Sequence, residues 1–479
     1  MSRALSLAGY QNYLVGGCVR DIILNKSPKD WDITTNANPE EIISLFPHTF
    51  YENSFGTVGI VNDNTPNETL RTIEVTPYRL EAEYSDFRHP NKVKWANNIE
   101  DDLARRDFTM NAIALSLDEA GKITDVVDPF NGINDIKDKL IRAVGNPTKR
   151  FQEDALRSLR AVRFVGELNF AIELDTQSAI IENSHLVENI SKERVRDEFI
   201  KIIMSENPGI SLDLLARLKL LKFISNELEK GIGVEQNKAH AYTVWEHLLR
   251  SLNHASKKGF PLHVRLASLF HDIAKPHTKH IKNGQITFYG HEVVGAKISK
   301  KIMNDLRFPK EITEKVYKLV RWHMFFSDTE QITHSAVRRI IKNVGTDLIW
   351  DLMDTRTADR IGTGRPKESP YRLRKYYAMI EEVMRDPISV KQLKVKGGDV
   401  MKITGTNGGP HIGYILEILL SEVLQNPELN TSEYLNNRVK ALYDLPGDEL
   451  IKRGIKARRQ NEGEEEKEVE KIRGEYGVK

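Results

Sequence analysis

The sequence predicts an α+β protein in which a first region of strands and helices precedes a long, almost entirely helical part. Runs rich in β-branched residues, at 57–61 and 71–75, are typical of strands. From about residue 135, apolar residues recur three and four positions apart, as in 151–164 and 194–204, which indicates helices. Histidine is also uneven, because ten of the 14 lie between His240 and His334. This compositional shift predicts a separate domain there.

Composition excludes several classes of protein. The 479 residues would fill about three domains of ordinary size. Hydrophobic residues at 40% and charged residues at 29% exclude global disorder. The net charge of +2 excludes a histone-like tail but not a local basic face. The single cysteine, Cys18, excludes an internal disulfide framework. Because we find neither a signal peptide nor an apolar run of about 18 residues, we expect a cytoplasmic protein without a membrane partner.

Two glycines and two aspartates form the first candidate site. Gly16 and Gly17 lie between a short apolar run and a predicted helix, where a ligand phosphate can approach the backbone and Arg20 can add a charged donor. Asp30 and Asp32 are two apart, so on a strand they point to the same side. Paired carboxylates can hold the Mg²⁺ ions that nucleotidyl transfer needs. A plain turn and a solvated strand end are the alternatives for each pair alone, and their combination favours the site.

This combination resembles the signature of nucleotidyltransferases of the DNA polymerase β superfamily. It is similar above all to the class II tRNA nucleotidyltransferases, the CCA-adding enzymes, and to the related bacterial poly(A) polymerases. The resemblance implies that Asp30 and Asp32 are catalytic and hold Mg²⁺, and that residues 1–135 form a palm-like head on a small mixed sheet. Glu74 could face the same metals as an auxiliary carboxylate, although an edge-strand glutamate is common.

The segment 105–112 joins two arginines, an acid and an amide. Arginine can fork onto triphosphate oxygens, and Asp or Asn can bond ribose hydroxyls. A surface salt-bridge network explains the composition equally well. The segment resembles a family motif associated with ribose recognition, which implies nucleotide contacts for Arg106, Asp107 and Asn111.

A predicted helix follows, on which Asp154 and Arg157 are three apart and share a face. An ordinary helical ion pair is the alternative to base recognition, in which the pair matches the Watson–Crick edge of a base. The motif resembles the family's Glu-Asp-x-x-Arg, where the protein serves as the template for C and A. Arg160 and Arg163 continue the cationic stripe toward phosphate.

Two further segments belong to this resemblance. The segment 193–199 resembles a family motif that we expect to pack helices together. The segment 79–90 resembles the mobile loop of enzymes that add the terminal A, and Asp86 and Arg88 suit a loop that orders on substrate. Its presence favours full CCA addition over CC-only addition.

The histidine-rich region carries imidazoles and carboxylates in apolar surroundings. Such ligands suit a divalent transition metal or a hydrolytic Mg²⁺ site. A single buried histidine is usually a satisfied core residue, but several of them would each need separate hydrogen bonds. The region looks like an HD-superfamily metal-dependent phosphohydrolase domain. This resemblance implies the core ligands His247, His271, Asp272 and Asp359, with His291 and His323 extending the set or binding substrate phosphate.

The predicted organisation is a head (1–135), a helical neck and body (136–235), an HD domain (236–366) and a helical RNA-binding tail (367–479). The expected activity is addition of CCA to tRNA from CTP and ATP, with an HD phosphohydrolase activity beside it. An A-adding enzyme or poly(A) polymerase of the same family, or a protein that is chiefly an HD phosphohydrolase, is the alternative. A non-catalytic RNA-binding protein is disfavoured because the expected carboxylates are all present.

Overall fold

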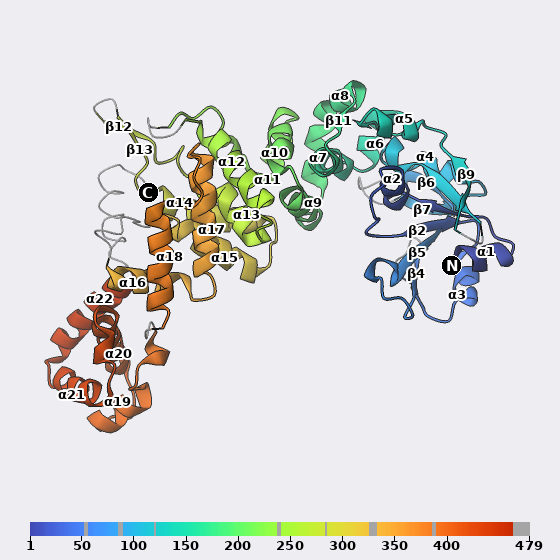
Figure 1. The fold of residues 1–479 in the computed structure, drawn as a ribbon. Coiled ribbons are helices and arrows are strands. Elements are labelled where there is room, and N and C mark those ends of the chain that lie inside the picture. The colour runs from blue at the N-terminus through green and yellow to red at the C-terminus, as the bar shows by residue number, and fades with distance from the viewer. Residues whose placement is uncertain are drawn as a thin grey trace. The chain divides into compact units, whose positions relative to one another are not determined.

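The computed structural model describes residues 1–51, 56–84, 90–118, 121–236, 241–282, 285–324, 333–385 and 389–462. The chain forms two compact units, Met1–Asn226 and Glu227–Lys479 (Figure 1). A seven-stranded sheet lies in the first unit, and helices make up most of the described chain that follows. The predicted α+β class is therefore confirmed. The division into four domains stays a prediction.

The sheet of the first unit is mixed. Its strands follow the order β3-β4-β5-β2-β1-β8-β9, with β2 and β5 parallel and the other neighbours antiparallel. These strands are β1 (Asn12–Val15), β2 (Asp32–Thr35), β3 (Thr49–Tyr51), β4 (Val58–Val61), β5 (Thr72–Pro77), β8 (Ala114–Leu117) and β9 (Ile123–Val127). A separate hairpin pairs β6 (Arg79–Tyr84) with β7 (Pro90–Trp95), and a short parallel pair joins β10 (Leu140–Ile141) to β11 (Ala171–Ile172).

The first unit also holds short helices beside the sheet and longer ones after it. The former are α1 (Ser2–Leu7), α2 (Gly17–Ile23), α3 (Pro39–Leu45), α4 (Ile99–Ala104) and α5 (Gly132–Lys137). The latter are α6 (Pro147–Glu153), α7 (Leu156–Leu168), α8 (Leu174–Asn183), α9 (Lys192–Met204) and α10 (Pro208–Arg217), and α11 (Leu221–Glu229) crosses the boundary between the two units. Helix α7 packs against both α9 and α10. This contact places the segment of Asp154 and Arg157 beside α9.

Local signals explain why these elements form where they do. Asn38 begins α3 with a capping box, in which its side chain accepts from the Glu41 amide and the Glu41 carboxylate accepts from the Asn38 amide. The core beneath the sheet includes the fully buried Tyr78 and Leu103 together with Val15. Burial of this apolar surface is the main force that holds β1 against the helices. The end of β1, where the glycine turn begins, is therefore well anchored.

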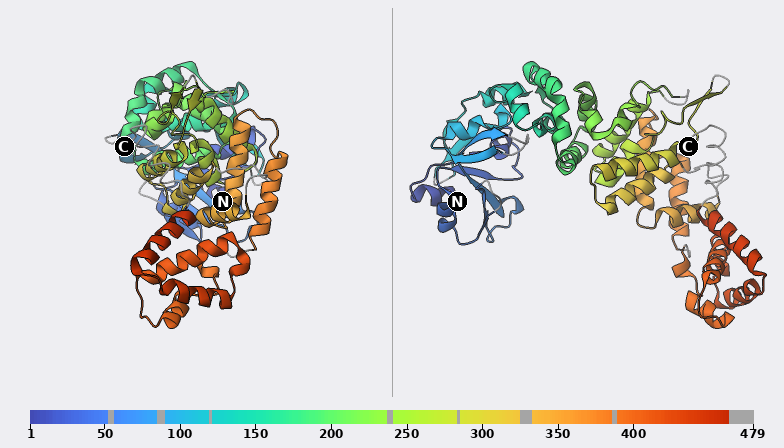
Figure 2. Two further views of the ribbon diagram at one scale, coloured as in Figure 1. Left: turned by 90° about the vertical axis from the view of Figure 1, so that its left-hand side faces the viewer. Right: turned by 180° about the vertical axis from the view of Figure 1, so that it is seen from behind.

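Among the described residues of the second unit, the regular elements are helices and one antiparallel strand pair, β12 (His280–Lys282) with β13 (Gln285–Thr287). Its helices are α12 (Val244–Lys257), α13 (Leu262–Phe270), α14 (His291–Asp305), α15 (Lys310–Trp322), α16 (His334–Val344), α17 (Ile349–Gly362), α18 (Tyr371–Val383), α19 (Gly397–Thr404), α20 (Pro410–Gln425), α21 (Ser432–Tyr443) and α22 (Gly447–Glu462). Helices α19 to α22, drawn in orange to red, pack against one another (Figure 2). Across the described residues, no helix combines the length and the apolar character needed to cross a membrane.

Candidate functional site

The glycine turn after β1 lies against two of the predicted site residues. Gly16 has a φ of +77°, a conformation that glycine adopts without a steric penalty. A Cβ atom at Gly16 would lie 3.1 Å from Arg106 Nη1 and 3.3 Å from Asp32 Oδ2. At Gly17, a Cβ would lie 3.6 Å from Arg20 Nη2. A side chain at Gly16 would therefore crowd the Arg106 guanidinium and the Asp32 carboxylate, whereas a Cβ at Gly17 would make only an ordinary contact with Arg20.

The two aspartates occupy different local structures. Asp32 opens β2 and pairs with Val15 at the end of β1. Asp30 lies two residues before the strand, in an exposed bend. Strand periodicity therefore does not set the direction of Asp30, contrary to the reasoning from sequence. Glu74 is the register partner of Asp32 on the parallel strand β5, so both side chains leave the same face of the sheet. Strand β5 is an interior strand, not an edge.

Four predicted nucleotide-binding residues form one hydrogen-bonded chain. Arg20 Nη1 donates to Asn111 Oδ1 at 3.0 Å, and Asn111 Nδ2 donates to Asp107 Oδ1 at 3.1 Å. Arg160 donates to Asp107 Oδ2 from Nε at 2.8 Å and from Nη2 at 2.6 Å. Burial alone would raise the pKa of Asp107, but Arg160 and Asn111 together hold that pKa below its usual value. The carboxylate also accepts from the Phe108 amide, so four hydrogen bonds satisfy it.

A buried aromatic ring underlies the arginines. The Phe164 ring centroid lies 4.5 Å from the guanidinium carbon of Arg163, 5.2 Å from that of Arg20 and 5.7 Å from that of Arg160. Such contacts between a cation and a ring face are attractive, more so when water is excluded. Arg163 is further held by an ion pair of 3.1 Å with the buried Glu198 of α9. The arginine stripe is therefore preorganised by its own unit.

Asp154 and Arg157 do not contact each other through their side chains as an ordinary helical pair would. Asp154 has extended backbone angles and ends α6, and Arg157 lies in the first turn of α7. The Asp154 carboxylate accepts from the Leu156 amide at 3.1 Å and from Arg194 Nη2 at 2.8 Å. Arg157 donates to Glu153 at 2.8 Å and to the Arg105 carbonyl at 3.0 Å. Each proposed reading group is thus held by a different partner.

Asp102 is a functional candidate that the sequence analysis missed. It is fully buried and accepts from Arg105 Nη2 at 2.6 Å and from Arg106 Nη2 at 3.2 Å. Burial alone would raise the pKa of Asp102, but the two guanidiniums hold that pKa below its usual value. The spacing of three and four residues was a usable signal, because such positions share a helix face. The Asp102 carboxylate thus holds the Arg106 guanidinium beside the glycine turn.

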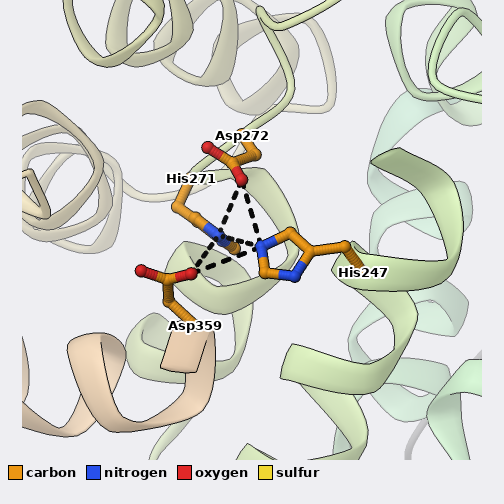
Figure 3. A group of neighbouring side chains, drawn as sticks. All are labelled: His247, His271, Asp272 and Asp359. Carbon is orange, nitrogen blue, oxygen red and sulfur yellow. Dashed lines mark hydrogen bonds and ion pairs between the residues drawn. The ribbon is translucent and has the colours of Figure 1, made fainter. Parts of the chain in front are cut away.

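The second unit brings the first four predicted HD ligands together (Figure 3). His247 comes from α12, His271 follows α13 directly, and Asp359 comes from α17. His247 Nε2 lies 2.8 Å from His271 Nε2 and 3.0 Å from Asp272 Oδ2. His247 Nε2 also lies 3.4 Å from Asp359 Oδ1. These buried atoms converge on one point, as the dashed lines in Figure 3 show.

The other two predicted histidines meet the opposite oxygen of the same aspartate. His291 Nε2 lies 3.1 Å, and His323 Nε2 3.7 Å, from Asp272 Oδ1. Both Nε2 atoms are buried without a hydrogen-bond partner among the described atoms. The Nδ1 atoms of His271, His291 and His323 lie 2.7–2.9 Å from backbone carbonyls. Because carbonyls only accept, Nδ1 carries the proton, which leaves the Nε2 lone pair for a metal. The residues therefore fit divalent metals.

Basic side chains balance the buried carboxylates. Lys275 Nζ lies 2.5 Å from Asp272 Oδ2, and Arg356 is paired with Asp359. Burial alone would raise the pKa of both aspartates, but Lys275 and Arg356 respectively are the main groups that hold those pKa values well below the usual one. For His271, burial alone would lower the pKa, but the two carboxylates raise it to about 10, so a metal that binds Nε2 would have to displace a proton from that atom.

Parts of two sequence predictions lie outside the described residues. Asp86 and Arg88 of the predicted mobile loop are not described, and neither is His240, the first residue of the histidine-rich region. The described residues of the predicted loop belong to β6 (Arg79–Tyr84) and to the start of β7, at Pro90. Two histidines outside the candidate ligand set have carboxylate partners: His263 pairs with Asp351 at 2.7 Å and His277 with Glu227 at 2.5 Å.

Three family models match consecutive parts of the chain. Residues 12–142 match the poly A polymerase head domain, and residues 169–232 match the probable RNA and SrmB-binding site of polymerase A. Residues 239–361 match the HD domain. The chain is therefore similar to a poly A polymerase head joined to an HD domain, and the residues of both candidate metal sites lie within these matches.

Curated relatives of this chain are CCA-adding enzymes. A CCA-adding enzyme of Ligilactobacillus salivarius (strain UCC118) is 44% identical over 217 residues, which are 45% of this chain and 51% of the relative. A CCA-adding enzyme of Geobacillus thermodenitrificans (strain NG80-2) is 44% identical over 230 residues, which are 48% of this chain and 54% of the relative. The chain thus spans about half the length of these curated relatives. The matches confirm the resemblance to the class II tRNA nucleotidyltransferase and bacterial poly(A) polymerase family with an HD domain.

Solved structures extend the likeness along the chain. The Bacillus stearothermophilus CCA-adding enzyme in complex with CTP is 26% identical, with a TM-score of 0.69, over 92% of this chain and 95% of that one. A Thermotoga maritima CCA-adding enzyme complexed with tRNA is 19% identical, with a TM-score of 0.53, over 92% of this chain and 93% of that one. The second comparison shows the shared fold alone.

Proposed function

We propose that this chain is a tRNA nucleotidyltransferase that adds CCA to tRNA 3′ ends from CTP and ATP. The observation that carries the proposal is the glycine turn, where Gly16 lies between the Asp32 carboxylate and the Arg106 guanidinium. A carboxylate that can bind a metal and a cation that can bind phosphate, brought together at one turn, are what nucleotidyl transfer requires. The similar CCA-adding enzymes support the choice of reaction.

Asp30 and Asp32 are the proposed catalytic residues, and Mg²⁺ is the proposed ion in the head. Two Mg²⁺ ions would lower the pKa of the attacking hydroxyl and stabilise the leaving pyrophosphate. In this reaction the 3′-hydroxyl of the tRNA attacks the α-phosphate of the incoming nucleotide. Arg106, aimed by Asp102, offsets triphosphate charge near the turn. Asp107 and Asn111 would form hydrogen bonds with the ribose hydroxyls in place of the hydrogen bond that now joins their two side chains.

Asp154 and Arg157 are the proposed base readers. An ionised carboxylate only accepts hydrogen bonds and a guanidinium only donates them. Cytosine and adenine both carry an exocyclic amino donor, whereas guanine and uracil carry a carbonyl oxygen in that place. The acceptor–donor pair therefore matches C and A and opposes G and U. Arg160 and Arg163 would carry phosphate contacts beside it.

Transfer RNA is the proposed partner, held through its phosphates by lysine and arginine. The RNA-binding match over residues 169–232 supports this assignment. The cytoplasm is the proposed location, because Cys18 has no second cysteine in the chain with which to form an internal disulfide.

One experiment tests the reaction and separates its alternatives. Transfer RNAs that end before CCA, after C and after CC are each offered with CTP and ATP separately. Full CCA addition predicts C on the first two and A on the third. Addition of A to the third substrate only would assign an A-adding enzyme, and long A tracts on any RNA would assign a poly(A) polymerase.

Removing the proposed metal ligands tests the catalytic assignment. Asp30→Ala with Asp32→Ala should abolish incorporation and leave tRNA binding intact. Loss of a metal ligand should cost more than the roughly 10–100-fold typical of residues that only support one. Incorporation near the wild-type rate would refute the assignment.

A second activity, metal-dependent phosphohydrolysis, is favoured by the buried cluster around Asp272. His247, His271, Asp272 and Asp359 would hold a divalent transition metal or Mg²⁺, which would activate water there. His291 and His323 would extend that set from the other oxygen of Asp272. Metal analysis of the purified chain and hydrolysis of 2′,3′-cyclic and phosphomonoester substrates test this activity. Absence of both metal and hydrolysis would make the domain a scaffold.

A further inference from the structure

We propose that Arg194 is a positioning residue that sets the nucleotide selectivity of the head by holding the Asp154 carboxylate. This inference rests on the proposed function and adds a residue to its base-reading site. The segment that carries Arg194 was expected from sequence only to pack helices together. The contact between Arg194 and Asp154 indicates that this segment also orients a base-reading side chain.

The break between α6 and α7 leaves Asp154 dependent on partners. Its backbone angles of φ −141° and ψ 102° lie outside both helices, so helix geometry does not orient its side chain. One carboxylate oxygen, Oδ1, accepts from the Leu156 amide at 3.1 Å. The other oxygen, Oδ2, accepts from Arg194 Nη2 at 2.8 Å. Arg194 is thus the side chain that sets the direction of Oδ2.

Arg194 is itself held rigidly against the base-reading segment. It lies in the first turn of α9, and Val195 and Phe199 of that helix are fully buried. The buried ion pair of Glu198 with Arg163 ties α9 to α7 a turn further on. The side chains of Arg194 and Asp154 are only 23% and 18% exposed, so water screens their attraction less than on an open surface.

Local helix stability does not explain an arginine at this position. The amino-terminal turn of a helix carries partial positive charge, so a cation there is unfavourable. Arg194 is therefore better explained by its tertiary partner than by α9 itself. A fixed, ionised Asp154 is what discrimination needs, because the acceptor must point at the exocyclic amino group of C or A and cannot accept from the carbonyl oxygens of U and G.

The test compares nucleotide choice in Arg194 variants of the full chain. With tRNA lacking CCA, the ratio of kcat/KM for CTP to that for UTP should fall by about 10-fold or more in Arg194→Gln, the scale of one specific base contact. The same fall is expected for ATP over GTP on tRNA ending in CC. Arg194→Lys keeps the charge without the planar fork and should give an intermediate ratio. It also carries the test if the glutamine variant does not fold.

Two controls separate positioning from other roles. Arg196→Gln lies on the same helix, where Arg196 pairs with its neighbour Asp197 at 2.8 Å, and should leave the ratios unchanged. In an Asp154→Asn background, Arg194→Gln should have no further effect on selectivity. A persisting effect would show that Arg194 contacts RNA or nucleotide directly and would overturn the proposal. So would unchanged ratios in Arg194→Gln.

The activity of the wild-type chain distinguishes failure of the proposed function from failure of the proposed role of Arg194. If it incorporates neither C nor A, the proposed function fails. If it incorporates both and the Arg194 variants retain its selectivity and its tRNA affinity, only this inference fails.

Discussion

At the scale of single residues, Gly16 shows how tightly the head is built. Its φ of +77° is unfavourable for any residue with a Cβ, and an added methyl group would press on Arg106 and Asp32 at once. Gly9 offers a matched comparison, because it has a φ of +88° but nothing within 4 Å of its missing Cβ. Comparing alanine variants of the two glycines therefore distinguishes the effect of backbone strain from the effect of crowding at Arg106 and Asp32.

We expect Gly16→Ala to lower the kcat/KM of nucleotide incorporation by up to about 100-fold, since small misplacements of reacting groups have effects of that size. Gly9→Ala also places a Cβ at a positive φ, so it should lose roughly 1–3 kcal/mol of stability but keep its activity. Steady-state incorporation and thermal unfolding measure the two effects. Equal activities in the two variants would mean that the turn does not hold the site.

Asp354 of α17 predicts a pH dependence of stability. Burial and the negative charge of Asp351 raise the pKa of Asp354 to about 6 from its usual 3.8. The folded state therefore binds more protons than the unfolded state between these values, so this residue lowers stability as the pH rises through that window.

Asp354→Asn should thus be more stable than the wild type at pH 8, by on the order of 1 kcal/mol after allowance for partial exposure. The gain should shrink as the pH is lowered to about 4.5, because the wild-type carboxyl then regains its proton. Urea unfolding at both pH values measures it. Asp347→Asn, exposed just before the same helix, is the control. A gain independent of pH would contradict the shifted pKa.

At the scale of elements, the capping of α12 connects helix stability to the metal cluster. Thr243 Oγ1 accepts from the Glu246 amide at 3.3 Å, and the Glu246 carboxylate accepts from the Thr243 amide at 2.9 Å. The Thr243 carbonyl accepts the first helical hydrogen bond, from His247 at 3.0 Å. The cap therefore fixes the turn that presents His247 to the cluster.

Thr243→Ala should lower the free energy of unfolding by about 1 kcal/mol, because one helix donor loses its acceptor. It should also weaken metal binding by the second unit. Thr243→Ser keeps the hydroxyl and should restore both properties. Chemical unfolding and metal titration are the measurements, and an alanine variant that matches the serine variant in both would argue that the cap is dispensable.

The helices also show what local pattern can predict. Apolar spacing indicated helix throughout 151–164, but the structure breaks at Asp154. The sequence holds no glycine or proline there, and the break depends on a short carboxylate that accepts from the Leu156 amide in place of helical continuation. The Asp102 contacts with Arg105 and Arg106 could have been found from their helical spacing. The Asp154–Arg194 pair, 40 residues apart, depends on packing that no local pattern encodes.

The candidate HD ligands could be predicted to lie together because unusual residue types stood in apolar helices, and the structure does bring them together. The sequence did not indicate that the two oxygens of Asp272 face two different groups of histidines. That arrangement arises from the convergence of several helices. Their role as metal ligands stays a prediction.

At the scale of the whole molecule, the two candidate sites lie in separate compact units. We expect their activities to be separable by mutation. His271→Ala should remove metal-dependent hydrolysis and leave nucleotide incorporation within about twofold of the wild type, since mutations at distant, independent sites usually act additively. Asp32→Ala should do the reverse. Parallel assays of both reactions on both variants measure this, and loss of both activities in either variant would contradict independence.

The burial of Cys18 allows site-specific labelling of the chain at introduced cysteines. It is the single cysteine, is 2% exposed, and has a pKa raised chiefly by burial, so its thiol should resist modification. Thiol-directed fluorophores would then label only cysteines introduced on purpose, such as Asp63→Cys in the first unit and Lys301→Cys in the second, both at exposed positions. Resonance energy transfer between such a pair would follow the separation of the units in solution as substrate RNA is added.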